Sequence, residues 1–199
     1  MVAAVDEVGR GALSGPVTVG VVLVTSRTRA APTGVRDSKA LRAAVREGLV
    51  PCIRQWAAGC AVAHASALEI DQYGVVAALR LAGHRALRSL DLRPDVILLD
   101  GDHDYLTPPP ATRLFASVEE LESLPDVVTM VRADVSCAAV AAASVLAKTS
   151  RDGLMEELAH QFPQYGWHAN KGYGTDGHRR ALAEFGPTPL HRRTWRLGE

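Results

Sequence analysis

Two adjacent carboxylates, Asp6 and Glu7, follow a short apolar run near the start of the chain. They precede a glycine-rich turn that carries one arginine, Gly9-Arg10-Gly11, and two further aspartates, Asp100 and Asp134, follow later apolar runs. Charged side chains at the end of a buried strand are costly unless a metal ion or a partner compensates them. Carboxylates at the ends of separate strands can converge at one edge of a sheet, where ligands bind in open α/β folds. We therefore predict that the four carboxylates form one site.

Four neighbouring carboxylates repel one another, so without cations at least one of them would have a raised pKa. Two divalent ions would remove this repulsion and could promote an in-line displacement at a phosphate. Because all the ligands are oxygens, we expect Mg²⁺ or Mn²⁺ as the cofactor and not zinc. Asp102 and Asp104 compete with Asp100 for a place in this site, and we favour Asp100 because it directly follows the apolar run.

Glu7 presents a geometric difficulty. Neighbouring residues of a strand face opposite sides of the sheet, so Glu7 reaches the metals of Asp6 only if the strand breaks there. Gly9 would allow such a break. A single aspartate before a glycine is more often a turn residue or a helix cap than a catalytic group, so the prediction depends on the convergence of all four carboxylates.

The composition is that of one well-buried domain, with 199 residues of which 47% are hydrophobic. Lys+Arg of 22 balances Asp+Glu of 22, so binding to a polyanion would depend on local basic patches. The three cysteines are widely separated and lack metal-binding spacing, which favours reduced thiols and no zinc site. We find neither a signal-peptide pattern nor an apolar run long enough for a membrane span, and we expect a cytoplasmic protein.

The positions of apolar runs and turn residues predict the elements that hold these side chains. The predicted strands cover residues 2–6, 15–25, about 60–65, 96–99 and 127–134. The predicted helices cover residues 40–56, with Asp37 or Ser38 as its cap, 68–90, 136–162 and 176–185. An antiparallel meander followed by two strand–helix alternations indicates a mixed five-stranded α/β sheet flanked by helices.

Five motifs together resemble bacterial ribonuclease HII, the type 2 ribonuclease H. They occur in the family's order and span nearly the whole chain: Asp6 to Gly11, Asp37-Ser38-Lys39, Leu99-Asp100-Gly101, Ala141 to Lys148 with Arg151-Asp152, and Lys171 to Thr175. The ending Pro189 to Arg193 also matches. The sister family, ribonuclease HIII, has a lysine in its glycine turn, a glutamate as fourth ligand and an extra N-terminal domain. Arg10, Asp134 and the position of Asp6 near the start therefore favour type HII.

The resemblance implies an RNase H-like fold in one catalytic domain, residues 1–199, with a helical C-terminal segment from about 163 to 199. It implies a metal-dependent endonuclease that cuts RNA in RNA/DNA hybrids. It also implies cleavage on the 5′ side of single ribonucleotides embedded in duplex DNA, leaving 3′-hydroxyl and 5′-phosphate ends. By position, the metal ligands and catalytic residues would be Asp6, Glu7, Asp100 and Asp134. We expect a monomer with no membrane partner.

The resemblance also implies the residues that bind the substrate. Gly9, Arg10 and Gly11 would contact the ribose 2′-hydroxyl, the group that distinguishes RNA from DNA, and the adjoining phosphate. Tyr173 would pack on the deoxyribose at the RNA–DNA junction. Phosphate contacts or substrate-facing positions are implied for Ser38, Lys39, Lys148, Arg192 and Arg193. Ser144, Lys148 and Arg151 share a helix face by their spacing, and a solvated helix face is the alternative interpretation.

Ala133 stands where the family has glycine before the fourth carboxylate, and we expect its Cβ to restrict the backbone at Asp134. Three alternative functions remain open. A junction resolvase of the same fold would share the carboxylates but has no use for the glycine turn and Tyr173. A catalytically silent nucleic-acid-binding protein would have lost an acidic ligand, and a metal-binding protein without a nucleic-acid substrate leaves the basic motifs unexplained.

Overall fold

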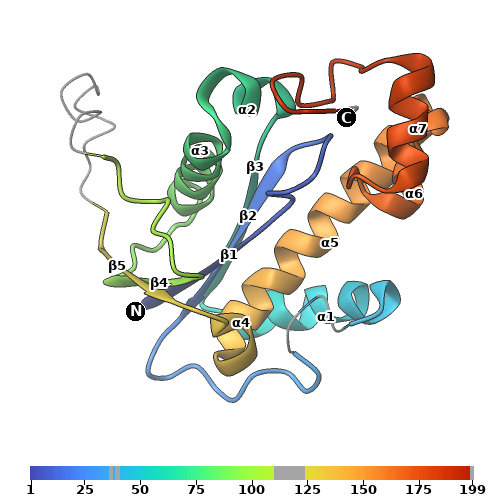
Figure 1. The fold of residues 1–199 in the computed structure, drawn as a ribbon. Helices are drawn as coiled ribbons and strands as arrows, with labels where there is room; N and C mark the ends of the chain where they lie inside the picture. Colours follow the sequence, from blue (N-terminus) through green and yellow to red (C-terminus); the bar gives the residue numbers. More distant parts are fainter. Residues whose placement is uncertain (36–37, 39–40, 110–123, 198–199) are drawn as a thin grey trace.

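A computed structural model describes residues 1–35, 38, 41–109 and 124–197 (Figure 1). Five strands form one mixed sheet in the order β3-β2-β1-β4-β5. The antiparallel pairs are β1 with β2 and β2 with β3, while β1, β4 and β5 run parallel. The strands are β1 (Val2–Val8), β2 (Val17–Val24), β3 (Gly59–Ala65), β4 (Val96–Asp100) and β5 (Asp126–Met130). The predicted meander and mixed sheet are confirmed.

Helices cover both faces of the sheet (Figure 1). On one face α3 packs against β2 and β3, and on the other α5 packs against β1 and β2, with α1 beside α5. The helices are α1 (Ala43–Trp56), α2 (Ala67–Tyr73), α3 (Val75–Arg88), α4 (Ala133–Ser136), α5 (Ala138–Gln161), α6 (Trp167–Asn170) and α7 (Asp176–Phe185). Among the described residues, none of these helices combines the length and apolar character that a membrane crossing requires.

Successive residues of β1 contribute to different cores. Val5 belongs to the core beneath α3, together with Leu79 of that helix. Ala4 packs on the other face with Val140 of α5. Because side chains alternate along a strand, Asp6 continues the face of α5 and Glu7 continues the face of α3.

Three predicted elements are wrong in detail. The helix expected over 40–56 begins at Ala43, and its N-cap is Arg42 and not Ser38. The helix expected over 68–90 is two helices, α2 and α3, because Gly74 between them has a φ of +80° and interrupts the helical backbone. The strand expected over 127–134 ends at Met130. Arg132 then takes a left-handed conformation, with φ 57°, and the chain enters the short helix α4 at Ala133. Asp134 therefore lies on a helix and not at a strand end.

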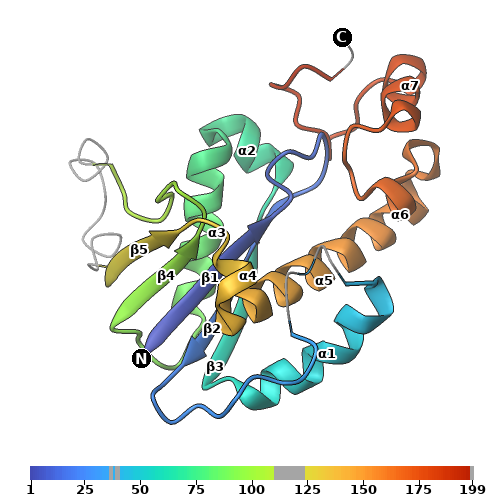
Figure 2. The ribbon, with the colours of Figure 1, turned by 60° about the horizontal axis from the view of Figure 1, so that its bottom comes forward.

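The C-terminal segment is helical, as expected, and packs at the far end of α5 beside the loop that follows β1 (Figure 2). Trp167 is fully buried there and stacks on Tyr165 at a centroid distance of 5.3 Å. Met155 of α5 and Leu13 of the loop after β1 belong to the same apolar cluster. The loop after β1 is therefore held between α5 and the C-terminal segment.

Candidate active site

Three carboxylates from three different elements converge: Asp6 from β1, Asp100 from β4 and Asp134 from α4. One oxygen of each lies within 4.8 Å of the others, and we call these residues the carboxylate cluster. The sheet register explains two of the positions, because Val5 pairs with Leu99 and the next residue on each parallel strand is the aspartate. Asp134 arrives by a different route, through the turn at Arg132.

Asp100 fixes the start of α4 and with it the place of Asp134. Its Oδ1 accepts hydrogen bonds from the backbone N–H of Ala133 at 2.7 Å and of Asp134 at 3.4 Å. A side-chain acceptor at the first N–H groups of a helix satisfies donors that have no partner within the helix. Ala133 has ordinary helical backbone, and the left-handed position is Arg132 instead. The expected restriction by the Cβ of Ala133 is therefore not a problem for this site.

The electrostatics of the carboxylate cluster suit a divalent cation. Asp6 is only 6% exposed, and burial together with the charges of Glu7 and Asp100 raises its pKa from 3.8 to about 7. Asp134 is 7% exposed. Buried carboxylate oxygens that repel one another are the donors that a hard ion such as Mg²⁺ or Mn²⁺ compensates. The residues present fit such an ion.

Asp102 and Asp104 take other places. Asp102 is exposed to solvent, and Asp104 accepts the backbone N–H groups of Leu106 and Thr107 at 2.9 Å each, as a turn residue does. The structure thus brings Asp100, and neither of its two neighbours, into the carboxylate cluster.

A chain of hydroxyls supports Asp6 from α5. Ser144 makes a side-chain hydrogen bond to Asp6, which lowers the pKa of Asp6 against the effect of burial. The hydroxyl oxygens of Ser144 and Ser38 lie 2.7 Å apart, and both residues are buried. When Asp6 is ionised it only accepts, so Ser144 then donates to Asp6 and Ser38 donates to Ser144. Lys39 and Asp37 lie outside the described residues.

The predicted helix face of Ser144, Lys148 and Arg151 is largely buried, so a solvated face does not describe it. Lys148 forms an ion pair with Asp152 at 2.7 Å, and its side chain is 18% exposed. Arg46 of α1 binds the other oxygen of Asp152 at 3.1 Å and donates to the carbonyl of Ser38 at 3.2 Å. One buried network therefore joins Lys148 to the segment that carries Ser38.

The glycine turn (Gly9 to Ala12) leaves β1 three residues after Asp6. The N–H of Ala12 donates to the carbonyl of Gly9 at 3.2 Å, and Arg10 and Gly11 form the exposed tip. Gly9 has a φ of +88°, and a Cβ there would lie 2.2 Å from Nε of Arg151. Only glycine meets both conditions without strain.

The comparisons with known proteins agree over almost the whole chain. A family model described as Ribonuclease HII matches residues 3–197. The chain belongs to the ribonuclease HII family. Ribonuclease HII from Streptomyces avermitilis is 46% identical over 195 residues, which are 98% of this chain and 76% of that protein. Ribonuclease H2 from Pyrococcus horikoshii OT3 superposes with a TM-score of 0.74 at 30% identity, covering 98% of this chain and 94% of the other. Bst-RNase HIII in complex with Mn²⁺, at 20% identity and a TM-score of 0.68 over 98% of this chain and 66% of its own, shares the fold.

Membership in the ribonuclease HII family confirms the expected RNase H-like fold and an endoribonuclease of the ribonuclease H class. Ribonucleases H depend on divalent metal, and the carboxylate cluster is a site that could bind it. This membership does not agree with any of the three alternatives raised by the sequence. These were a junction resolvase, a silent binding protein and a metal-binding protein of another class.

Glu7 stands apart from the carboxylate cluster. The strand continues to Val8, and Glu7 pairs in register with Val19, so no break turns its side chain toward the face of Asp6. The charge of Glu7 nevertheless contributes to the raised pKa of Asp6.

Tyr105, from the loop after β4, is a neighbour of the carboxylate cluster that the sequence did not single out. It is 1% exposed, and burial together with the charges of Glu7, Asp6 and Asp100 raises its pKa.

The two C-terminal arginines differ sharply. Arg193 is exposed. Arg192 is fully buried, and its guanidinium donates to the carbonyls of Gly9, Arg10 and Gly15 at 2.6 to 3.3 Å. The geometry therefore favours support of the glycine turn by Arg192 over the direct substrate contact that the resemblance implied. Tyr173 is half-buried and lies under the guanidinium of Arg151, 5.5 Å from the ring centroid.

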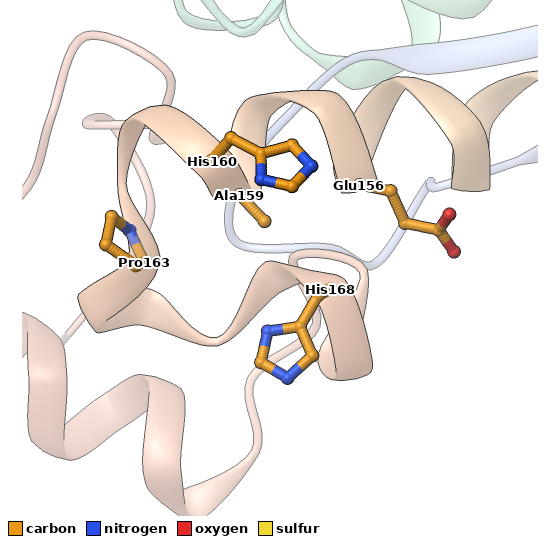
Figure 3. Close-up of a pocket in the computed structure, with 5 residues that line it drawn as sticks. All are labelled: Glu156, Ala159, His160, Pro163 and His168. Atoms are coloured by element: carbon orange, nitrogen blue, oxygen red, sulfur yellow. The ribbon is translucent and has the colours of Figure 1, made fainter.

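A separate pocket of about 460 Å³ lies in the C-terminal segment (Figure 3). It is lined by Glu156, Ala159, His160, Pro163 and His168. Figure 3 shows that the Glu156 carboxylate and the two imidazoles are spread around the pocket and do not converge on one point. Glu156 forms an ion pair with Lys171. The residues that the sequence singled out for catalysis or substrate binding do not line this pocket.

Proposed function

We propose that this ribonuclease H cleaves RNA in RNA/DNA hybrids and also cuts on the 5′ side of single ribonucleotides in duplex DNA, leaving 3′-hydroxyl and 5′-phosphate ends. The observation that carries the proposal is that the glycine turn begins only three residues after Asp6, directly beyond the end of β1. Three residues of extended chain span only ~10 Å. A group that binds a ribose at the exposed tip, Arg10 and Gly11, would then hold the neighbouring phosphate near the carboxylate cluster.

We propose that Asp6, Asp100 and Asp134, with Glu7, bind two divalent ions, Mg²⁺ or Mn²⁺. The complex of Bst-RNase HIII with Mn²⁺, a protein of the same fold, supports this choice of ion. The chemistry supplied by bound ions is the activation of a water molecule and the stabilisation of the leaving 3′-oxygen. Asp100 orients Asp134 through the start of α4, and Ser38 and Ser144 orient Asp6.

The remaining residues would bind the nucleic acid. Arg10 and the exposed backbone of the glycine turn would contact the 2′-hydroxyl and a phosphate, and Tyr173 would pack on the sugar at the junction. Lys39, Lys148 and Arg193 are proposed as phosphate contacts. Ser38 and Arg192 are buried, so we assign them to support of the site instead. Residues 1–199 would act as one catalytic domain in a cytoplasmic monomer, at the first step of ribonucleotide excision repair.

The test uses a labelled DNA duplex with one ribonucleotide, with Mg²⁺ or Mn²⁺, and an all-DNA duplex as control. The expected result is a single cut on the 5′ side of the ribonucleotide that neither the control duplex nor the Asp134→Asn variant shows. Cleavage only of hybrids with several consecutive ribonucleotides would overturn the junction roles of Arg10 and Tyr173. Near-normal cleavage by Asp134→Asn would overturn the ligand assignment.

A further inference from the structure

Two buried guanidiniums, those of Arg151 and Arg192, lie beneath the glycine turn, and we call this pair the arginine clamp. Arg192 donates through Nη2 to the carbonyl of Gly9 at 2.6 Å and through Nη1 to the carbonyl of Arg10 at 2.8 Å. In a trans peptide the C=O and the following N–H point in opposite directions. Holding these two carbonyls inward therefore directs the N–H groups of Arg10 and Gly11 outward, to the exposed tip of the turn.

Arg151 joins the segment that follows the glycine turn, residues 14–16, to the segment that carries Tyr173. Its nitrogens donate to the carbonyls of Pro16 at 2.8 Å, Ser14 at 3.1 Å and Lys171 at 2.9 Å. Backbone bonds reinforce this connection, since the carbonyl of Gly172 accepts the N–H groups of Leu13 at 2.8 Å and Ser14 at 3.2 Å. The guanidinium of Arg151 thus links the chain just after the glycine turn to the segment that carries Tyr173, and its side chain also packs directly against Gly9.

The arginine clamp is energetically unfavourable as a simple anchor for the C-terminal segment, because it buries two charged side chains. Both side chains are fully buried, and within the described part of the chain no carboxylate lies within 4.0 Å of either guanidinium. Burial and the neighbouring charge of Arg151 lower the pKa of Arg192 to about 9. Asp71 and Asp152 attract Arg192 and Arg151 only from a distance, without an ion-pair contact. Burying a charge without such a contact is destabilising, and apolar packing would anchor a segment as well or better. A flat fork of donors, however, can hold several carbonyls in one fixed geometry, which an apolar side chain cannot do.

We propose that Arg192 and Arg151 are positioning residues for ribose recognition. Arg192 fixes the outward N–H groups of the glycine turn so that they can bind a 2′-hydroxyl. Arg151 fixes the position of Tyr173 relative to that turn. This inference rests on the proposed function, because it requires that the turn reads a ribose. Neither arginine touches the substrate; both act through the backbone carbonyls they hold.

The experiment measures discrimination and not activity. Binding of the protein to a duplex with one ribonucleotide and to the same duplex in all-DNA form is measured in EDTA, where nothing is cleaved. Arg192→Lys keeps the charge but cannot bridge the carbonyls of Gly9, Arg10 and Gly15 together. Loss of one well-placed hydrogen bond should lower the ratio of the two affinities about three- to tenfold. A variant that is only less stable would bind both duplexes more weakly and leave the ratio unchanged.

Arg46→Lys is the matched control. Arg46 is also buried and also donates to backbone carbonyls, those of Ser38 and Leu41, but it does not contact the glycine turn. Because Arg46 also pairs with Asp152, which holds Lys148, its substitution can weaken binding of both duplexes, but it should leave the ratio of the two affinities unchanged. If Arg192→Lys fails to fold, Trp195→Leu removes only the ring that the Arg192 guanidinium covers at 4.8 Å, and a smaller drop of the ratio is expected.

The outcomes separate this inference from the proposed function. If the wild-type protein does not cut the single-ribonucleotide duplex with Mg²⁺ or Mn²⁺, the proposed function fails. If it cuts that duplex but Arg192→Lys, or a folded Trp195→Leu, keeps the wild-type affinity ratio, the positioning role is overturned. Equal wild-type affinity for the two duplexes would overturn it as well, since no discrimination would remain for the arginine clamp to support.

Discussion

Asp6→Asn should stabilise the metal-free protein and at the same time remove its nuclease activity. The carboxylate of Asp6 is buried against Glu7 and Asp100, an arrangement that metal ions compensate and that is unfavourable without them. Asparagine has nearly the same shape, and its carbonyl can still accept the backbone N–H of Glu7, a bond of 2.8 Å in the wild type. The substitution therefore removes the charge and keeps the packing.

The size of the expected gain in stability follows from the pKa of Asp6. Burial, and then the two neighbouring carboxylates, raise the pKa of Asp6 from 3.8 to about 7. The folded protein holds this proton more tightly than the unfolded chain, so stability is greatest below pH 3.8 and is lost as the pH rises to about 7. At about 1.4 kcal/mol per pKa unit, the loss at pH 8 is at most ~4 kcal/mol. The Asp6→Asn variant does not show this loss, because asparagine carries no charge at these pH values.

Urea unfolding in EDTA at pH 5 and at pH 8 tests this reasoning. The advantage of Asp6→Asn over the wild type should be larger at pH 8 than at pH 5. Added Mn²⁺ should stabilise the wild type and should stabilise the variant much less. An advantage that is equal at the two pH values, or a variant that is less stable at pH 8, would refute the electrostatic account of Asp6.

Three further outcomes are expected. Tyr173→Ala should reduce cleavage of single-ribonucleotide duplexes more than cleavage of long hybrids in parallel kinetic assays, and an equal loss would contradict its role at the junction. Gly9→Ala should lower the free energy of unfolding by more than about 2 kcal/mol in urea, because its φ is +88° and the new Cβ would lie 2.2 Å from Nε of Arg151; Gly48→Ala, where nothing lies within 4 Å, is the control. Burial, and then His178, lower the pKa of His191 from 6.5 to about 4. Stability should therefore fall as the pH drops from 6.5 to about 4, by at most ~3 kcal/mol, and this loss should be smaller in His191→Asn.

The strands could be predicted because their signals are local. Alternating or continuous apolar runs bounded by turn residues mark each strand, and the parallel register then brings Asp6 beside Asp100. The position of Asp134 could not be predicted in this way. The apolar run continues through Val131, so the pattern extends the strand, whereas the backbone turns at Arg132, a residue type without a turn preference. The hydrogen bonds that stabilise α4 come from Asp100, which is distant in the sequence.

The burial of Arg192 also depends on contacts that are distant in the sequence and could not be predicted from it. A basic residue near a chain end is usually exposed, and by sequence alone Arg192 and Arg193 are equivalent. They differ because Arg192 packs against a segment far from it in the chain, residues 9–15, whose backbone carbonyls accept from its guanidinium. The carbonyls that accept from Arg192 are backbone atoms and leave no mark in the sequence. Predictions from residue types therefore identified the motifs of the site but could not separate the residues that contact a substrate from those that hold the contacting residues in place.

For Glu7, elementary geometry predicted the side of the sheet on which the residue lies. Adjacent strand residues face opposite sides, and β1 does continue through Glu7 to Val8 without a break. Asp6 thus faces α5 with Ser144 behind it, while Glu7 faces the side of Tyr105. The two neighbours differ in their surroundings although they share a motif. Their substitutions should therefore not be interchangeable.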